Sequence, residues 1–135
     1  MTELKKLRYR GRPLFFITHG FMSGSIPSWA YEMKDALIGM GYNVVLVEWY
    51  SIWKTYSYAV ADTRIVSDVL AVFIDELVRL DLVSSSQIVL VGFSLGAHIS
   101  GMVAQKLGQA KIKAIIEAFY KKQTIVCVSC SNTYY

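Results

Sequence analysis

The 135-residue sequence predicts an α/β fold with a mostly parallel sheet. Four short apolar runs rich in β-branched residues have the composition of strands that are buried on both faces. Helical patterns separate these runs, so the elements alternate in the order β-α-β-α-β-α-β. Alternation of this kind predicts parallel strands joined by right-handed crossovers, with helices on both faces of the sheet.

The composition excludes several classes of protein. A hydrophobic share of 54% with 18% charged residues excludes disorder, and the length allows one domain with a real core. No run of eighteen apolar residues occurs, so no membrane-spanning segment is predicted. The first residues lack the apolar stretch of a signal peptide, and we therefore expect none in this chain.

The net charge of +4 is concentrated at one end of the sequence. The basic residues of the first twelve positions are Lys5, Lys6, Arg8, Arg10 and Arg12. The remainder holds nine basic and nine acidic residues. A nucleic-acid-binding face would need basic residues spread over the fold, so no nucleic-acid partner is predicted. We treat residues 1–11 as a basic lead segment.

The first strand is predicted at residues 14–18, after Pro13. It ends at His19-Gly20-Phe21, where the glycine lets the backbone turn and present N–H groups. Two interpretations of His19 are open, a catalytic base or a side chain that holds the loop by a hydrogen bond. We favour the second, because a catalytic base must reach the hydroxyl proton that it removes from the nucleophile and must have an orienting partner of its own.

A helix is predicted from about Trp29 to Met40, with Ser28 as its N-cap. The next buried strand is predicted at residues 43–47. Glu48 follows at the carboxyl end of this strand, where α/β enzymes keep functional groups. For Glu48 we favour a polar tie to a neighbouring loop over a role in catalysis.

Residues 49–58, WYSIWKTYSY, hold five aromatic side chains in ten positions. They form either an exposed lip that meets acyl chains or a lipid surface, or the packed anchor of a long loop, which we favour. A helix is predicted from Ala59 to Leu80. The apolar side chains expected to face the core are Val66, Val69, Leu70, Phe73, Ile74, Leu77 and Val78.

Residues 87–107 predict a buried strand, a five-residue turn and a helix. The turn, Gly92-Phe93-Ser94-Leu95-Gly96, has the G-x-S-x-G pattern, in which a serine sits on a strained corner and side chains at the glycines would collide with backbone. The N–H of Leu95 lies in the first turn of the helix, where unpaired donors can stabilise an oxyanion. The pattern predicts that Ser94 is a nucleophile.

The last strand of the α/β pattern is predicted at residues 111–116. Cys127 and Cys130 form a C-x-x-C pair, for which we favour neither a redox role nor a zinc site, because one pair is too few for structural zinc. We expect residues 117–135 to be a tail unrelated to the fold, and the strand at 112–116 to be left as an exposed edge. The sequence indicates no cofactor and no metal site.

Four motifs fall in the order and spacing of one family: RPLFFITHGF at 12–21, VEW at 47–49, AVADTR at 59–64 and GFSLGAH at 92–98. Over about residues 12–116 the sequence resembles the animal pancreatic-lipase family, most closely the secreted phospholipase A1 enzymes of insects. The resemblance implies a partial α/β-hydrolase (lipase-like) domain at 12–116. It also implies the spatial strand order 43–47, 14–18, 87–91, 112–116.

The resemblance further implies hydrolysis of lipid carboxylic esters, with a phospholipid or an acylglycerol as substrate, and secretion. Ser94 would be the nucleophile, and the backbone N–H groups of Phe21 and Leu95 would form the oxyanion hole. Phospholipase A1 and triacylglycerol lipase are not distinguished by these motifs. A non-catalytic lipid-binding relative is the alternative, although such relatives typically lose the serine that this sequence keeps.

The sequence departs from the family after Ile116. Family members continue with Gly-Leu-Asp-Pro-Ala-Gly-Pro, whose Asp is the triad acid, whereas this chain has Glu117 and no such motif. Glu117 is therefore a weak candidate for a substitute acid. The family's catalytic His lies beyond residue 135, and His98, one helical turn past Ser94, is expected to be a packed, hydrogen-bonded residue. We expect a truncated form with little activity of its own.

Overall fold

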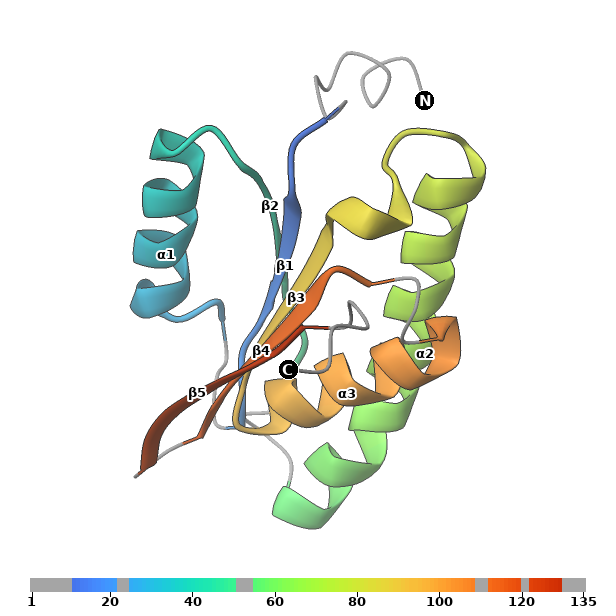
Figure 1. Cartoon of the computed structure of the whole chain (residues 1–135). Helices are drawn as coiled ribbons and strands as arrows, with labels where there is room; N and C mark the ends of the chain where they lie inside the picture. Colours follow the sequence, from blue (N-terminus) through green and yellow to red (C-terminus); the bar gives the residue numbers. More distant parts are fainter. Residues whose placement is uncertain (1–10, 22–24, 51–54, 109–111, 120–121, 130–135) are drawn as a thin grey trace.

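A five-stranded sheet forms the centre of the computed structural model, with α1 on one face and α2 and α3 on the other (Figure 1). The structure describes residues 11–21, 25–50, 55–108, 112–119 and 122–129. The elements are β1 (Leu14–Thr18), α1 (Ser28–Gly39), β2 (Asn43–Val47), α2 (Tyr56–Arg79), η2 (Ser85–Gln87), β3 (Ile88–Phe93), α3 (Leu95–Leu107), β4 (Ala114–Phe119) and β5 (Lys122–Ser129).

The strands lie in the order β2-β1-β3-β4-β5. The first four are parallel, which confirms the predicted order and the mostly parallel sheet. The expectation that the strand after α3 is an exposed edge is wrong, because β5 pairs with β4 in the antiparallel direction. The strand also begins later than predicted, at Ala114, where its register with Val89 of β3 starts.

Some expectations fall outside the described residues. These are the first ten residues of the basic lead segment, positions 51–54 of the aromatic stretch, and Cys130. None of the helices in the described ranges is long and apolar enough to cross a bilayer.

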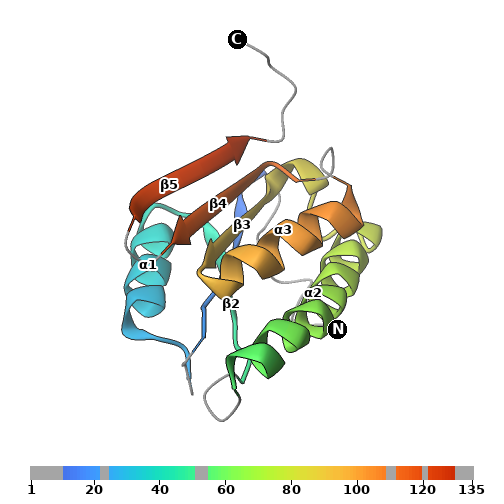
Figure 2. The ribbon, with the colours of Figure 1, turned by 90° about the horizontal axis from the view of Figure 1, so that it is seen from below.

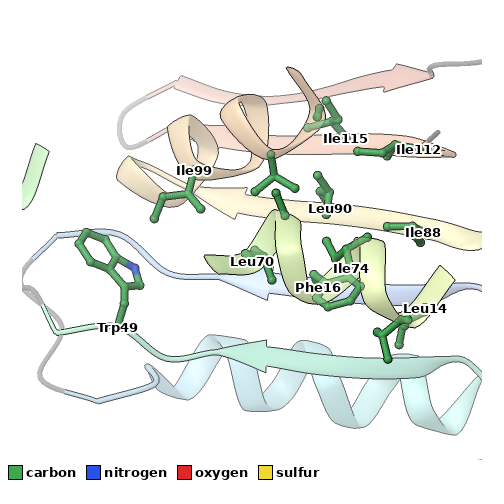
Figure 3. Close-up of a cluster of buried hydrophobic side chains, with 14 of the residues drawn as sticks. Leu14, Phe16, Trp49, Leu70, Ile74, Ile88, Leu90, Ile99, Ile112 and Ile115 are labelled. Atoms are coloured by element: carbon green, nitrogen blue, oxygen red, sulfur yellow. The ribbon is translucent and has the colours of Figure 1, made fainter. Parts of the chain in front are cut away.

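The two faces of the sheet build two apolar clusters, because successive side chains of a strand point to opposite faces. Phe16 of β1 and Leu90 of β3 are fully buried on the face covered by α2 and α3 (Figure 3). Ile17 and Val91, one position further along each strand, are buried in the cluster on the opposite face with Ala30 of α1. Burial on both faces explains why these strands are continuous apolar runs.

Helix α2 buries most of the stripe that its apolar pattern predicted, but its buried surface is shifted toward a row of small residues. Leu70, Ile74 and Leu77 are buried as predicted, but Val69 and Phe73 are 66% and 40% exposed. The difference has a physical reason, since small residues at four-residue spacing are buried where α2 and α3 lie side by side (Figure 2). The residues of that stripe are Ala59, Thr63, Ser67 and Ala71.

The start of α1 also differs from the prediction. Pro27 is the N-cap, with extended backbone at φ −70° and ψ 156°, and Ser28 is the first helical residue. The carbonyl of Pro27 accepts a hydrogen bond from the Ala30 N–H at 3.0 Å, and no side chain caps the helix. Proline fixes the backbone angle that a cap residue needs, so it takes the place expected for Ser28.

Candidate active site

Ser94 joins the end of β3 to the start of α3 in a backbone conformation that L-residues rarely adopt. Its φ is 54° and its ψ is −119°, and it is the N-cap residue of α3. Its carbonyl accepts a hydrogen bond from the Ala97 N–H at 2.9 Å, which closes the first turn of the helix. A non-glycine residue held in this region is strained by roughly 1–3 kcal/mol, which persists only where the surrounding structure imposes it.

Two glycines leave the room that this turn needs. A Cβ on Gly92 would lie 2.5 Å from the backbone N of Ala97, and a Cβ on Gly96 would lie 2.7 Å from the carbonyl O of His19. Both distances are shorter than real Cβ contacts allow. The two glycines therefore let α3 start directly against β3 and against the end of β1.

The end of β1 lies against Ser94. A Cβ on Gly20 would be 2.8 Å from the Cβ of Ser94 and 2.9 Å from the carbonyl O of Phe93. The loop after β1 and the turn after β3 are neighbours because their strands are paired and parallel, with Thr18 in register with Gly92. Phe21 follows Gly20 directly, and Leu95 is the first residue of α3.

His19 is buried between the ends of β1 and β2, where it holds the two loops together. Its Nδ1 lies 3.0 Å from the Gly20 carbonyl, and its Nε2 lies 3.4 Å from the Trp49 backbone N. Both contacts are satisfied by the neutral tautomer that carries its proton on Nδ1. This geometry confirms the favoured interpretation of His19 as a residue that holds the loop.

The surroundings of His19 favour its neutral form. Burial lowers the pKa of His19 below its ordinary value, against weaker opposite effects of the Gly20 carbonyl and the Glu48 charge. The indole ring of Trp49 stacks on the imidazole at 5.7 Å between centroids, and its Nε1–H donates to the His19 carbonyl at 3.0 Å. A buried neutral imidazole whose two nitrogens both form hydrogen bonds holds its neighbouring loops in place.

Trp49 is the residue of this region that sequence reasoning missed. A polar tie to a neighbouring loop was expected from Glu48, but the Glu48 side chain is exposed and forms no hydrogen bond with the described residues. Trp49 makes that tie with both its backbone and its ring. The available signal was a tryptophan two positions after a buried strand, because a buried indole usually needs a partner for its N–H.

The second histidine differs from its expected environment. His98 was expected to be packed and hydrogen-bonded, but its side chain is exposed on α3 and lines a surface groove beside α2. The helix is amphipathic at this position, since Ala97 and Ile99 on either side of His98 are buried. Spacing from Ser94 placed His98 one turn along the helix but not on its inner face.

Glu117 lies on β4 in register with Gly92, two positions before Ser94 along the neighbouring strand. Its Oε1 is 3.7 Å from where a Cβ on Gly101 of α3 would stand, so the carboxylate lies under the middle of the helix. No described contact joins Glu117 to Ser94 or to either histidine. Within the described ranges, no group of three His, Cys, Asp or Glu side chains could hold a metal ion.

Comparison with known proteins places these features in a family. A family model described as Lipase matches residues 5–117. Phospholipase A1 1 of Dolichovespula maculata is 35% identical over 112 residues, which are 75% of this chain and 35% of that protein. Phospholipase A1 of Vespa crabro is 37% identical over 119 residues, 78% of this chain and 40% of that protein.

A vertebrate relative matches as well. Lipase member H of Xenopus tropicalis is 42% identical over 98 residues, which are 70% of this chain and 21% of that protein. The chain thus spans well under half the length of these relatives. The parallel sheet and its flanking helices have the α/β-hydrolase pattern. Since the family model covers residues 5–117 of 135, the chain belongs to the lipase family.

Proposed function

We propose that this chain carries the nucleophile and the oxyanion hole of a lipid carboxylic-ester hydrolase of the lipase or phospholipase A1 type. The observation that carries the proposal is the strained backbone of Ser94 between β3 and α3, with Gly20 packed against it. Strain at a single serine is expected where a nucleophile must stand clear of the sheet. The names of the relatives support an ester-bearing lipid as substrate.

The proposed chemistry begins with attack of the Ser94 Oγ on the carbonyl carbon of the ester, while a base takes the hydroxyl proton. The negative charge on the carbonyl oxygen would be stabilised by the backbone N–H groups of Phe21 and Leu95. The bond to the alcohol then breaks, the alcohol leaves with a proton, and the acyl group stays on Ser94. Water attacks this acyl-enzyme and releases the fatty acid.

Neither histidine of this sequence is placed as a base for Ser94. Its two histidines are His19, which is buried with both ring nitrogens engaged, and His98, which is exposed on α3. We therefore propose that the chain by itself has little activity. A non-catalytic lipid-binding role is less favoured, because binding gives no reason to keep a strained serine. Secretion and contact with a lipid surface belong to the same proposal and rest on the family resemblance.

Labelling of the chain with a fluorophosphonate tests the proposal. Ser94 should displace fluoride from the probe on the order of 10⁴-fold more slowly than the serine of a complete relative, because triad members act as a unit. Peptide mapping should place the label on Ser94, with loss of labelling in Ser94→Ala and no loss in the control Ser86→Ala. Label spread over several serines would argue against the nucleophile assignment, and a rate like that of the relative would refute the proposed inactivity.

The same assay tests Glu117 as a substitute acid. Its place beneath α3 leads us to expect the same slow labelling in Glu117→Gln. Glu48→Gln is a matched control, since Glu48 is an exposed carboxylate just after β2, and two strands, β1 and β3, separate β2 from β4. Complete loss of labelling in Glu117→Gln alone, with an unchanged melting temperature, would identify Glu117 as the acid.

A further inference from the structure

The peptide group between Gly20 and Phe21 carries one of the two N–H groups of the proposed oxyanion hole. A trans peptide is rigid and planar, so its carbonyl and its N–H point in opposite directions and turn together. Whatever fixes the direction of the Gly20 carbonyl therefore also fixes the direction of the Phe21 N–H. This peptide lies next to the nucleophile, since a Cβ on Gly20 would stand 2.8 Å from the Cβ of Ser94 and 3.4 Å from its Oγ.

The imidazole of His19 fixes the direction of that carbonyl. Its Nδ1 lies 3.0 Å from the Gly20 carbonyl O, which is the distance of a good N–H···O hydrogen bond. His19 is buried, so solvent does not compete for this bond. A hydrogen bond to a carbonyl also polarises the peptide group, which makes the N–H on its other side a stronger donor. Both effects reach the N–H of Phe21.

Trp49 determines which ring nitrogen of His19 is the donor. Its backbone N lies 3.4 Å from the His19 Nε2, and because a backbone N–H only donates, Nε2 accepts and Nδ1 carries the proton. The indole ring reaches from the end of β2 to the end of β1 (Figure 3), where it stacks on the imidazole at an interplanar angle of 12°. Burial lowers the pKa of His19, which favours the neutral ring that this arrangement requires.

We propose that His19 is a positioning residue of the oxyanion hole, because its Nδ1–H holds the Gly20 carbonyl so that the Phe21 N–H is directed to the oxyanion formed at Ser94. The proposal rests on the proposed ester-hydrolase function and adds to it a side chain that does not touch the substrate. This role differs from joining two loops. The Trp49 indole N–H, which donates to the His19 carbonyl at 3.0 Å, joins the loops, whereas the bond from His19 to Gly20 stays within one loop.

Two substitutions separate the functions of the two ring nitrogens of His19. The asparagine side chain has its amide N one bond from Cγ, as Nδ1 is in histidine, so His19→Asn keeps a donor for the Gly20 carbonyl and loses the acceptor for the Trp49 N–H. The longer glutamine side chain brings its amide oxygen to the place of Nε2, so His19→Gln keeps the acceptor and loses the donor. Each variant loses one hydrogen bond of the ring, so a role limited to stability would affect both alike.

The chemical shift of the Phe21 amide nitrogen measures the positioning in the 135-residue chain without any reaction, because this shift depends on the hydrogen bond that the Gly20 carbonyl accepts. We expect the shift to be kept in His19→Asn and to move upfield in His19→Gln. Trp49→Phe is a matched control, since it removes the indole N–H and keeps an aromatic ring and the backbone N–H that sets the tautomer. It should lower the melting temperature and leave the Phe21 shift in place.

Phosphonylation of Ser94 measures whether this direction matters to the oxyanion hole. A bond forms between the Ser94 Oγ and the phosphorus of a fluorophosphonate, fluoride leaves, and the hydroxyl proton passes to the buffer. The phosphoryl oxygen then stands where the oxyanion would. After complete labelling, the Phe21 amide proton should shift downfield in the unchanged chain and in His19→Asn, and much less in His19→Gln. The labelling rate of His19→Gln should fall on the order of 10-fold, less than the ~10²–10³-fold lost when an oxyanion-hole donor is removed outright.

The proposal is overturned if the Phe21 shifts are the same in His19→Asn and His19→Gln, or if Trp49→Phe moves them as far as His19→Gln does. It is also overturned if the ring nitrogen shifts of His19 place the proton on Nε2, a measurement on the unchanged chain that needs no variant to fold. Failure of Ser94 to react would refute the hydrolase function, and the Phe21 nitrogen shifts of the unlabelled chains would still decide the positioning. A labelled Ser94 without a downfield shift at Phe21 would overturn this role of His19 while the nucleophile stands.

Discussion

Gly96 stands where the first turn of α3 meets the end of β1, and a side chain there would press on the backbone carbonyls of Thr18 and His19. Backbone cannot move aside as a flexible side chain can, so the whole helix would have to shift. We predict that Gly96→Ala lowers the free energy of unfolding by about 2–3 kcal/mol in a denaturant titration.

The matched control is Gly39→Ala. Gly39 is the last residue of α1, is exposed, and has nothing within 4 Å of a Cβ. Alanine there should raise the free energy of unfolding by about 0.4–1 kcal/mol, because it restricts the unfolded chain. Equal effects of the two substitutions would mean that α3 does not approach β1 as closely as described.

His19 predicts a pH dependence of stability. Its pKa is lower in the folded state than the ordinary value of 6.5, so the unfolded chain binds more protons once the pH falls below 6.5. The stabilisation by the neutral imidazole is fully present above pH 6.5 and is lost as the pH falls from there toward the folded pKa. One such group changes the free energy of unfolding by at most about 1.4 kcal/mol per pH unit.

Denaturant titrations between pH 7.5 and 5 check this slope. The His19→Gln variant should be less stable at pH 7.5 and should lose the fall that begins at pH 6.5. His98→Gln removes the exposed histidine and should keep the profile of the unchanged chain. If the pH dependence of stability disappears in His98→Gln and persists in His19→Gln, its assignment to His19 is wrong.

At the scale of elements, the choice of buried face on α2 makes a testable contrast between two adjacent residues. Leu70 is 6% exposed and Val69 is 66% exposed. Leu70→Ala should cost about 2–5 kcal/mol of unfolding free energy, because it leaves a cavity against the sheet. Val69→Ala should change stability by less than about 0.5 kcal/mol, as expected for a surface position. Similar costs at both positions would mean that α2 is rotated relative to the sheet.

Sequence patterns predicted the existence and type of the four parallel strands and three helices. A strand that is buried on both faces is a continuous apolar run, and a helix that is buried on one face has apolar residues at three- and four-residue spacing. The patterns predicted most of the buried face of α2, but not its shift toward the small residues of that helix. Val69 and Phe73 lie on the exposed side of the predicted stripe, whereas the small residues Ala59 and Ser67 are buried. The close approach of α3 causes this shift, and a pattern of bulky apolar residues does not contain it. Capping by Pro27 was missed for a similar reason, since Ser28 has the stronger intrinsic preference.

The candidate site was predictable as far as its chemistry is local. The glycines and the strain of Ser94 follow from a five-residue pattern. The stacking of Trp49 on His19 joins residues that are thirty positions apart, which a local pattern does not contain. The exposure of His98 depends on the rotation of α3 about its axis, which the pattern does not contain either. The oxyanion-hole N–H groups of Phe21 and Leu95 stay predictions until a bound anion shows their direction.

At the scale of the whole molecule, β5 protects an edge that would otherwise be open. It pairs with β4 from Ala114 to Phe119, and β4 is an apolar strand. Deletion of residues 120–135 should expose the unpaired backbone groups of β4 and promote association between chains. Light scattering coupled to size exclusion should show a shift from the smallest species toward larger ones. A truncated chain that stays as small as the full one would show that β5 gives no such protection.

The strand order also determines how early the central strands can pair while the chain is being synthesised. β1 is the central partner of both β2 and β3, and Leu14 of β1 pairs with Ile88 of β3, 74 positions later in the chain. At roughly 5–20 residues per second, a ribosome needs about 4–15 s to deliver that partner after β1 has been made. For those seconds the apolar strand β1 lacks its partner β3. A chaperone that binds exposed apolar segments would act chiefly during this interval. The nucleophile turn needs β1 and β3 together, so it can form only after β3 has been made.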